Sequence, residues 1–397
     1  MADETAALPT VLHLSGDFPD PIDSFKTPVI RSLLDLTASE FSHRVVSINR
    51  KSPSLPTLLA DTVKGLGRPG LAVSSQQFDR GVALQYGAPG RGLFHATMLR
   101  QLGDWLAESI AQGERPDLLV GHKLAIEGIA IQRAASALNL PYALSIQGDT
   151  DTKILSARPD LTRTLAKAFH EADVVFPFSP WALKAVEAKL GRRQGPTILL
   201  PCPTDLDTPV MPTAGGEGLV TVFHLKNYKR KNLPAMVDAM KQLEAAGLSP
   251  KLTVVGGGNA QERQRCQSLA NGLNGITFAG PQDRAAVRQT MARAKGFVMP
   301  SLRESFGLVF IEALFAGLPI IYPAGTAVDG FLDGLPFALR VDARDPAALA
   351  AAMRKLIEDE QPLKAALAHW LASDECRRFT RPDIGRQFAR GLQIAMA

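Results

Sequence analysis

Short apolar runs alternate along the chain with longer stretches whose apolar residues recur at helical spacing. The runs predict β-strands at residues 11–14, 41–48, 117–121, 142–146, 173–176, 197–200, 219–223, 252–255, 276–279, 296–299 and 320–322. The longer stretches predict helices at residues 27–36, 96–111, 125–138, 161–172, 181–190, 234–246, 261–271, 284–294, 309–316, 346–358 and 384–394. Strands that alternate with helices build parallel sheets covered on both faces. The predicted fold class is therefore α/β, with doubly wound, Rossmann-like sheets.

A segment rich in proline, threonine and glycine interrupts this pattern at residues 201–218. The alternation restarts behind it, which indicates a domain boundary. A chain of 397 residues is long enough for two domains. We expect a first domain at 1–205, a second at 206–375 and a C-terminal segment at 376–397. The last helix of that segment is expected to pack back on the first domain.

The composition is that of a globular protein, with 46% hydrophobic and 21% charged residues. The three cysteines, Cys202, Cys266 and Cys376, are odd in number and far apart, which favours a reducing compartment and argues against a disulfide framework or a zinc cluster. The N-terminus has no basic leader, and no apolar run reaches about 18 residues. We therefore expect a cytoplasmic protein without a signal peptide or a membrane-spanning helix.

The formal net charge is +5, and bases outnumber acids between residues 26 and 100. This excess is either an ordinary solvated surface or an attraction for an anionic acceptor or an anionic membrane face. Aromatic residues are not interleaved with the bases, so nucleic acid is not an expected partner. The same region includes a glycine-rich stretch at 65–92, which we expect to be an irregular excursion over the surface.

Two glutamates flank the start of the helix predicted at 309–316. Glu304 lies just before the helix, and Glu312 lies inside it. Ser305 and Gly307 fall at the helix N-terminus, where unpaired N–H groups favour an anion. A carboxylate beside a phosphate is better suited to neutral hydroxyl donors. The stretch therefore indicates either a site for a phosphate that bears a polyhydroxy group, or a capped helix with two solvated glutamates.

A basic loop follows the first strand of the second half. Lys226 and Lys231 are five residues apart, so both can converge on one phosphate if the loop curls. The alternative is a solvated basic turn. The triple glycine at 256–258 allows a close backbone approach to a ligand, but it is not the G-x-G-x-x-G fingerprint of dinucleotide-binding proteins.

Polar residues also follow two strands of the first half. His122 lies at the end of one strand and is either a satisfied turn histidine or a donor to a substrate hydroxyl or developing charge. Gln147 to Asp151 follow the next strand, and their Asp-x-Asp pattern is compatible with a divalent metal. Because turns favour Asp for other reasons, we expect no metal there.

The segment E-S-F-G-L-V-F-I-E from Glu304 to Glu312 resembles the Glu-x7-Glu signature of retaining glycosyltransferases with the GT-B fold, specifically family 4 (group 1). Most of the chain takes part in the resemblance. Residues in the order typical of that family are Gly256, Gly257, Gly258, Gly280, Phe297, Asp345 and Pro346. In this family two doubly wound Rossmann-like domains face a central cleft.

The resemblance implies a role for each matching residue. Glu304 would bind hydroxyls of the donor sugar, and Glu312 would bind the ribose of the nucleotide. The pair Lys226 and Lys231 would stabilise the leaving diphosphate, and His122 matches a frequent family histidine. Backbone N–H groups for the diphosphate and sugar would come from Ser305, Phe306, Gly307 and Leu308, and the early loop at Gly16 would lie near the donor phosphates. The nucleotide-diphosphate sugar is a substrate, so neither a cofactor nor a metal is implied.

Four positions depart from the family pattern, one of them the linker, where Cys202-Pro203-Thr204 replaces the Asn-Gly that is often found. The basic pair is usually Arg then Lys, whereas Lys226 lacks the planar fork of arginine. The early loop has the single glycine Gly16 where paired glycines are usual. Gln147 stands where the family often has a histidine. The last two changes affect the acceptor side of the reaction.

The resemblance implies transfer of a sugar to a hydroxyl of a glycan or a lipid-linked acceptor, with retention at the anomeric carbon. Such a hexosyltransferase would serve polysaccharide or glycolipid biosynthesis, at the cytoplasmic face of a membrane if the basic surface makes peripheral contact. One alternative is a non-catalytic subunit of the same fold that binds a nucleotide sugar or a glycan, and a second is a sugar-nucleotide epimerase. The two intact glutamates favour the transferase.

Overall fold

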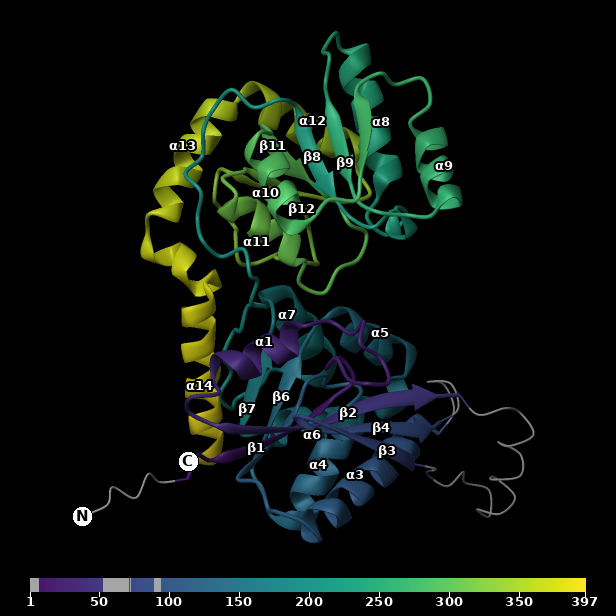
Figure 1. The fold of residues 1–397 in the computed structure, drawn as a ribbon, viewed down its shortest axis with the longest axis vertical. Coiled ribbons are helices and arrows are strands. Elements are labelled where there is room, and N and C mark those ends of the chain that lie inside the picture. The colour runs from purple at the N-terminus through teal and green to yellow at the C-terminus, as the bar shows by residue number, and fades with distance from the viewer. Residues whose placement is uncertain (1–6, 53–70, 72, 89–93) are drawn as a thin grey trace. The chain divides into compact units, whose positions relative to one another are not determined.

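The computed structural model describes residues 7–52, 71, 73–88 and 94–397 (Figure 1). These residues divide between two compact units. The first unit comprises Met1–Phe178, Ala182–Pro201 and Pro382–Ala397, and the second comprises Ser179–Trp181 and Cys202–Arg381. Each unit has a sheet of its own, so the prediction of two Rossmann-like α/β domains is confirmed.

The first unit is built on a seven-stranded sheet with the order β3-β4-β2-β1-β5-β6-β7. Its central strands are short and buried on both faces, as expected where helices cover both sides of a parallel sheet. All pairs are parallel except β3 with β4. The strands are β1 (Thr10–Ser15), β2 (Ser42–Lys51), β3 (Val73–Phe78), β4 (Gly81–Gly87), β5 (Leu118–Gly121), β6 (Tyr142–Ile146) and β7 (Val174–Pro177).

The helices of this unit follow the strands in alternation. They are α1 (Val29–Leu36), α3 (His95–Ala111), α4 (Gly128–Leu138), α5 (Asp149–Ala157), α6 (Thr162–Glu171), α7 (Pro180–Leu190) and the terminal α14 (Arg381–Met396). Figure 1 shows α3 and α4 on one face of the sheet and α1 on the other, as right-handed crossovers in opposite directions require. In α14, the Phe388 ring lies 5.3 Å from the Phe176 ring of β7 and 6.5 Å from the His13 ring of β1, measured between centroids.

The expectation of an irregular excursion at residues 65–92 is wrong for the part that the structure describes. Residues 73–78 and 81–87 form the antiparallel hairpin of β3 and β4 at the edge of the sheet. The strand β3 reads V-S-S-Q-Q-F and exposes its polar side chains, so it lacks the apolar run that predicts a strand. Residues 65–70, 72 and 89–92 lie outside the described residues.

The strand predicted at residues 197–200 is also wrong. This segment runs beside β7 and makes backbone hydrogen bonds from Ile198 to Val175 and from Leu200 to Pro177, but it forms only a single isolated bridge, at Thr197. Pro196 and Pro201 flank it and have no N–H to donate, which limits ladder formation at both ends.

The second unit is built on a six-stranded parallel sheet with the order β10-β9-β8-β11-β12-β13. Its strands are β8 (Leu219–Val222), β9 (Leu252–Val255), β10 (Ile276–Gly280), β11 (Gly296–Val298), β12 (Ile320–Pro323) and β13 (Ala338–Val341). Its helices are α8 (Leu233–Ala245), α9 (Ala260–Leu269), α10 (Arg284–Ala292), α11 (Leu308–Phe315), α12 (Pro346–Glu358) and α13 (Glu360–Leu371). Fully buried Met240 of α8 and Met353 of α12 belong to one core cluster. The sequence pattern did not predict β13, α13 or, in the first unit, α5.

In each unit the chain reverses its direction of travel across the sheet once. The reversal lies between β1 and β5 in the first unit and between β8 and β11 in the second. Ligands of such sheets bind outside the carboxyl ends of the strands at this switch point. Ligand contacts are therefore expected in the loops after β1 and β5, and in the loops after β8 and β11.

The triple glycine after β9 offers a test of backbone constraint. Gly256 has a φ of +151°, and a Cβ there would lie 1.8 Å from the carbonyl oxygen of Phe223, whereas a Cβ on Gly257 would meet only Pro281, at 3.6 Å. We expect Gly256→Ala to lower the free energy of unfolding by about 2 kcal/mol or more, and the matched control Gly257→Ala by less than about 1 kcal/mol. Urea unfolding of both variants measures the difference, and equal stabilities would contradict the close approach.

Candidate functional site

The loops after β8 and β11 meet at the switch point of the second unit. The backbone N–H of Leu302 donates to the carbonyl of Arg230 at 2.9 Å, which ties one loop to the other. Lys231 Nζ donates to Glu304 Oε2, and Arg230 Nη1 lies 3.9 Å from Glu304 Oε1. The Lys231 and Glu304 side chains are only 11% and 12% exposed, so solvent screens this ion pair little. The structure thus brings a predicted carboxylate and a predicted lysine together.

The backbone of Glu304 is held from the other side by Thr326. The N–H of Glu304 donates to Thr326 Oγ1 at 2.9 Å, and the Thr326 hydroxyl donates back to the Glu304 carbonyl at 2.6 Å. Both polar groups of the Glu304 backbone are therefore satisfied by one side chain. This reciprocal pair of hydrogen bonds fixes the backbone position from which the Glu304 side chain extends.

The helix α11 begins directly after this loop. Gly307 is its N-cap residue, with a φ of +76°, and a Cβ there would lie 2.8 Å from the Phe310 ring. No side chain caps this helix, and within the described part of the chain the N–H groups of residues 305–308 have no acceptor. Ser305 and Leu308 are half-buried, and Phe306 is buried. Such unpaired N–H groups and the helix dipole favour an anion.

Lys226 occupies a different environment from Lys231. It lies in the 3-10 helix η2 (Leu225–Asn227), where its backbone N–H donates to His224 Nδ1 at 3.2 Å. Its side chain is exposed, and no ion pair between Lys226 and Glu304 is formed among the described residues. The predicted convergence of Lys226 with Lys231 stays a prediction.

Glu312 lies inside α11 and is largely buried. Thr204, from the segment that joins the units, donates its hydroxyl to Glu312 Oε1 at 2.8 Å. Burial raises the pKa of Glu312, and the Thr204 hydrogen bond opposes that rise. The sequence places Thr204 in the linker but gives no sign that it contacts Glu312. One carboxylate oxygen of Glu312 is thus occupied, and its predicted ribose contact stays a prediction.

A second polar cluster surrounds the switch point of the first unit. The N–H of Gly16, after β1, donates to Glu127 Oε1 at 2.7 Å, and Lys123 Nζ donates to Asp17 Oδ1. Burial raises the pKa of Glu127 to about 8, although nearby Lys123 opposes that rise. Its second carboxylate oxygen is buried and has no hydrogen-bond partner in the described part of the chain. His122 is fully buried in the same region.

Asp17, Lys123 and Glu127 were missed at the sequence level. The available signal was Glu127 itself, an acid inside the apolar run L-A-I-E-G-I-A-I. A buried acid in such a run marks a position where the carboxylate has a defined partner. Here the partner is the backbone of the early loop, so Glu127 holds Gly16 in place.

The Asp-x-Asp pattern after β6 serves the backbone. Asp151 is buried and accepts hydrogen bonds from the N–H groups of Ala125 and Gln147, each at 2.9 Å, and of Gly148 at 3.3 Å. Asp149 Oδ2 lies 3.6 Å from Lys153 Nζ. The described residues contain no group of three or more His, Cys, Asp or Glu side chains arranged to hold a metal ion. The Asp151 carboxylate instead orders the start of α5 and the loop after β5.

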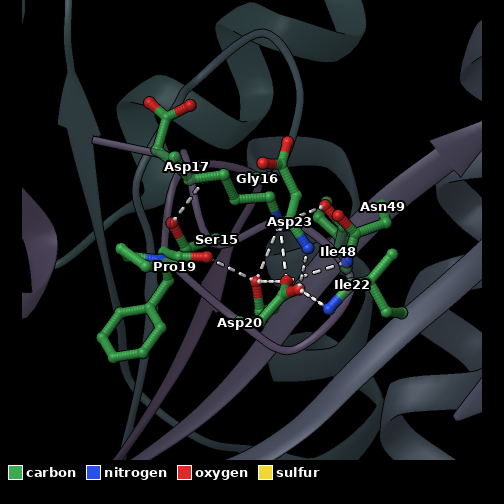
Figure 2. Close-up of polar contacts among 12 residues, drawn as sticks. Ser15, Gly16, Asp17, Pro19, Asp20, Ile22, Asp23, Ile48 and Asn49 are labelled. Carbon is green, nitrogen blue, oxygen red and sulfur yellow. Dashed lines mark hydrogen bonds and ion pairs between the residues drawn. The ribbon is translucent and has the colours of Figure 1, made fainter. Parts of the chain in front are cut away.

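The early loop is organised around Asp20, as Figure 2 shows. Its buried carboxylate accepts hydrogen bonds from Lys26 Nζ at 2.7 Å, Ser47 Oγ at 2.5 Å and Asn49 Nδ2 at 2.8 Å. It also accepts the N–H groups of Ile22 and Asp23, each at 2.8 Å. These bonds hold the pKa of Asp20 at about 2 even though burial acts in the opposite direction.

This arrangement changes the meaning of the basic excess at residues 26–100. Lys26 is buried in its ion pair with Asp20, and exposed pairs join Arg44 to Glu114 and Arg80 to Asp35. Lys64, Arg68 and Arg91 lie outside the described residues. Because Asp20 and Glu114 lie outside residues 26–100, their two pairs neutralise part of the excess within the unit. The attraction for an anionic membrane face stays a prediction. In the described part of the chain, no helix combines the length and the apolar character needed to cross a membrane.

Comparison with known proteins relates the second unit to a known family. Residues 217–359 match the family model of "Glycosyl transferases group 1". The chain resembles the group 1 glycosyltransferases. A phosphatidyl-myo-inositol mannosyltransferase of Mycolicibacterium smegmatis is 29% identical over 188 residues, which cover 46% of this chain and 47% of that protein. A D-inositol 3-phosphate glycosyltransferase of Corynebacterium jeikeium is 31% identical over 131 residues, which cover 30% of this chain and 31% of that protein. The chain spans less than half the length of these curated relatives.

A resemblance in fold, in contrast to the group 1 match, extends over nearly the whole chain. A sucrose-phosphate synthase from Thermosynechococcus elongatus superposes with a TM-score of 0.66 at 20% identity, and the match covers 98% of each chain. At that identity the likeness shows the fold alone. The predicted GT-B fold is confirmed at this level.

Proposed function

We propose that this chain is a retaining glycosyltransferase that moves a sugar from a nucleotide-diphosphate donor to an acceptor hydroxyl. The observation that carries the proposal is the Lys231–Glu304 ion pair beside the uncapped N-terminus of α11. One carboxylate, one ammonium group and a set of unpaired N–H groups match the three parts of a donor: sugar hydroxyls, leaving diphosphate and phosphate oxygens.

Lys231 can serve two partners at once. An ammonium group has three N–H donors, and Glu304 occupies one of them. The others are available to the oxygens of a diphosphate, where negative charge grows as the glycosidic bond breaks. The positive charges of Lys231 and Arg230 together outweigh the negative charge of Glu304, so Glu304 can accept from sugar hydroxyls without a net repulsion of the phosphates. We propose that these cations and the helix N-terminus make a metal unnecessary.

Retention is proposed to proceed by attack on the same face that the diphosphate leaves. The acceptor hydroxyl would give its proton to the departing phosphate, and the sugar would pass through an oxocarbenium-like state. The names of the two curated relatives include the words inositol or inositol phosphate. We therefore propose a phosphorylated or lipid-linked polyol as the first acceptor class to test, and we keep the cytoplasm as the proposed location.

A calorimetric screen of nucleotide sugars, including UDP-glucose and GDP-mannose, tests the proposal directly. We expect one donor to bind with micromolar to millimolar affinity and to be hydrolysed slowly when no acceptor is present. Binding without hydrolysis or transfer would favour the non-catalytic subunit, and an altered nucleotide sugar as product would favour the epimerase. No binding to any nucleotide sugar would overturn the proposal.

A further inference from the structure

Three histidines and a threonine form a row of hydrogen bonds through the first unit. Thr37 directly follows α1, His43 lies in β2, His13 in β1, and His122 follows β5. The Thr37 Oγ1 to His43 Nε2 distance is 2.9 Å, the His43 Nδ1 to His13 Nε2 distance is 2.9 Å, and the His13 Nδ1 to His122 Nε2 distance is 3.0 Å. The row therefore joins the end of a helix to the switch point of the sheet.

The hydroxyl of Thr37 sets the direction of the row. It donates to the carbonyl of Leu33 at 3.1 Å, one turn back in α1. A hydroxyl has one proton, so Thr37 Oγ1 can only accept from His43 Nε2. If its proton pointed to His43 instead, its lone pairs would face the Leu33 carbonyl oxygen at the same 3.1 Å. The helix end thus assigns the proton of His43 to Nε2.

When each ring is neutral, the proton on His43 also determines which nitrogen carries the proton in His13 and then in His122. Burial lowers the pKa of His122 to about 3 and of His43 to about 4, and it places the pKa of His13 well below its ordinary value. A neutral imidazole has one N–H and one lone pair. His43 Nδ1 therefore accepts from His13 Nε2, and His13 Nδ1 accepts from His122 Nε2. This order leaves a lone pair on His122 Nδ1.

His122 Nδ1 is the open end of the row. It is buried and has no hydrogen-bond partner among the residues that the structure describes. A buried polar atom without a partner costs about 1–3 kcal/mol, so an occupant that donates a hydrogen bond is favoured. His122 is next to Lys123 in the sequence. The Lys123–Asp17 ion pair and the Glu127–Gly16 hydrogen bond lie at the same switch point of the first sheet.

We propose that Thr37, His43 and His13 are positioning residues that hold His122 with an unprotonated Nδ1, so that this atom accepts a hydrogen bond from a substrate hydroxyl. The inference rests on the proposed function and deepens it, because it makes His122 an acceptor where the sequence suggested a donor. The shared chemistry is a hydroxyl, which either the donor sugar or the acceptor polyol carries.

The order of protons is tested on the ligand-free full chain. With 15N-labelled histidine, and with the His122 signals assigned from a His122→Gln variant, we expect Nδ1 of His122 to be unprotonated and Nε2 to carry the proton. Thr37→Val removes the fixed acceptor and should mix the two tautomers, whereas Thr37→Ser keeps the hydroxyl and should keep the order. A protonated Nδ1 in the wild type, or the same order in Thr37→Val, would overturn the inference.

The hydroxyl contact is tested with UDP-glucose or GDP-mannose, the matching nucleoside diphosphate, and inositol 3-phosphate as probes. A change in the His122 Nδ1 signal with the nucleotide sugar but not with the diphosphate identifies the donor hydroxyl, and a change with inositol 3-phosphate identifies the acceptor. We expect Thr37→Val, but not Thr37→Ser, to weaken binding of that probe by about 3- to 10-fold. An unchanged signal at saturation would mean that water alone fills the position and would overturn the contact. If no nucleotide sugar binds, the proposed function fails, while the ligand-free proton order still decides the positioning role.

Discussion

Replacing Lys231 by methionine is expected to lower kcat/KM for sugar transfer by about 10²- to 10³-fold. The variant keeps the length and the apolar stem of the side chain but removes the charge that we propose stabilises the leaving diphosphate. Because that charge acts most strongly in the transition state, the loss should fall mainly on kcat. Steady-state kinetics with the donor found by calorimetry measures the effect.

The matched control is Lys229→Met, two residues away in the same loop. Lys229 is exposed and lies over the Tyr228 ring, 5.9 Å from its centroid, and among the described residues it forms no ion pair with Glu304. We expect its activity to stay within about threefold of the wild type. Equal losses in both variants would point to the general charge of the loop, and an active Lys231→Met variant would remove Lys231 from the mechanism.

Glu304→Gln separates the two halves of the ion pair. The amide keeps the shape of the side chain but loses the charge that holds Lys231. If the two residues act as one unit, the double variant should be little worse than the more damaged single variant. Independent, multiplying losses would mean that each residue acts on a separate part of the donor.

Asp20→Ala is expected to lower the free energy of unfolding of the first unit by about 3–5 kcal/mol, because it leaves the buried Lys26 ammonium without its counter-ion. It also removes the shared acceptor of Ser47, Asn49 and the Ile22 N–H. Urea unfolding followed by amide hydrogen exchange in β1 and β2 reports this unit separately from the other.

Asp23→Ala is the control for this prediction, since the Asp23 side chain is exposed and, within the described residues, accepts a hydrogen bond only from the Phe25 N–H, at 3.1 Å. We expect it to cost less than about 1 kcal/mol. Asp20→Ala combined with Lys26→Met removes both charges and should recover part of the loss. A single variant as stable as the control would show that Lys26 finds another partner.

The same carboxylate predicts an acid sensitivity. The pKa of Asp20 is lowered to about 2 by its hydrogen bonds, below the ordinary value near 4. A lowered pKa contributes stability that is present above about pH 4 and is lost as the pH falls towards 2. Asp20→Asn should lack this part of the pH dependence.

The sequence predicted those features that depend on neighbours along the chain. The alternation of strands and helices, the loop at Glu304 and the start of α11 all follow from local patterns. The β3–β4 hairpin was missed because an edge strand exposes polar residues such as Ser74 and Gln76. Patterns of apolar burial are informative only where burial occurs.

Features that depend on distant residues were beyond local reasoning. The partners of Asp20 include Ser47 and Asn49, which only the pairing of β1 with β2 brings near it. The histidine row needs His13, His43 and His122 from three strands or strand ends. Lys226 and Lys231 looked equivalent in sequence, and only the fold of the loop separates an exposed side chain from one paired with Glu304.

The placement of α14 affects the order in which the chain can fold as it is synthesised. The second unit is complete once residue 381 has emerged from the ribosome, whereas the first unit contains residues from both ends of the chain. Until α14 arrives, the Phe176 ring lacks the Phe388 ring that packs against it. Although the first unit is translated first, it is therefore the second of the two to complete its core.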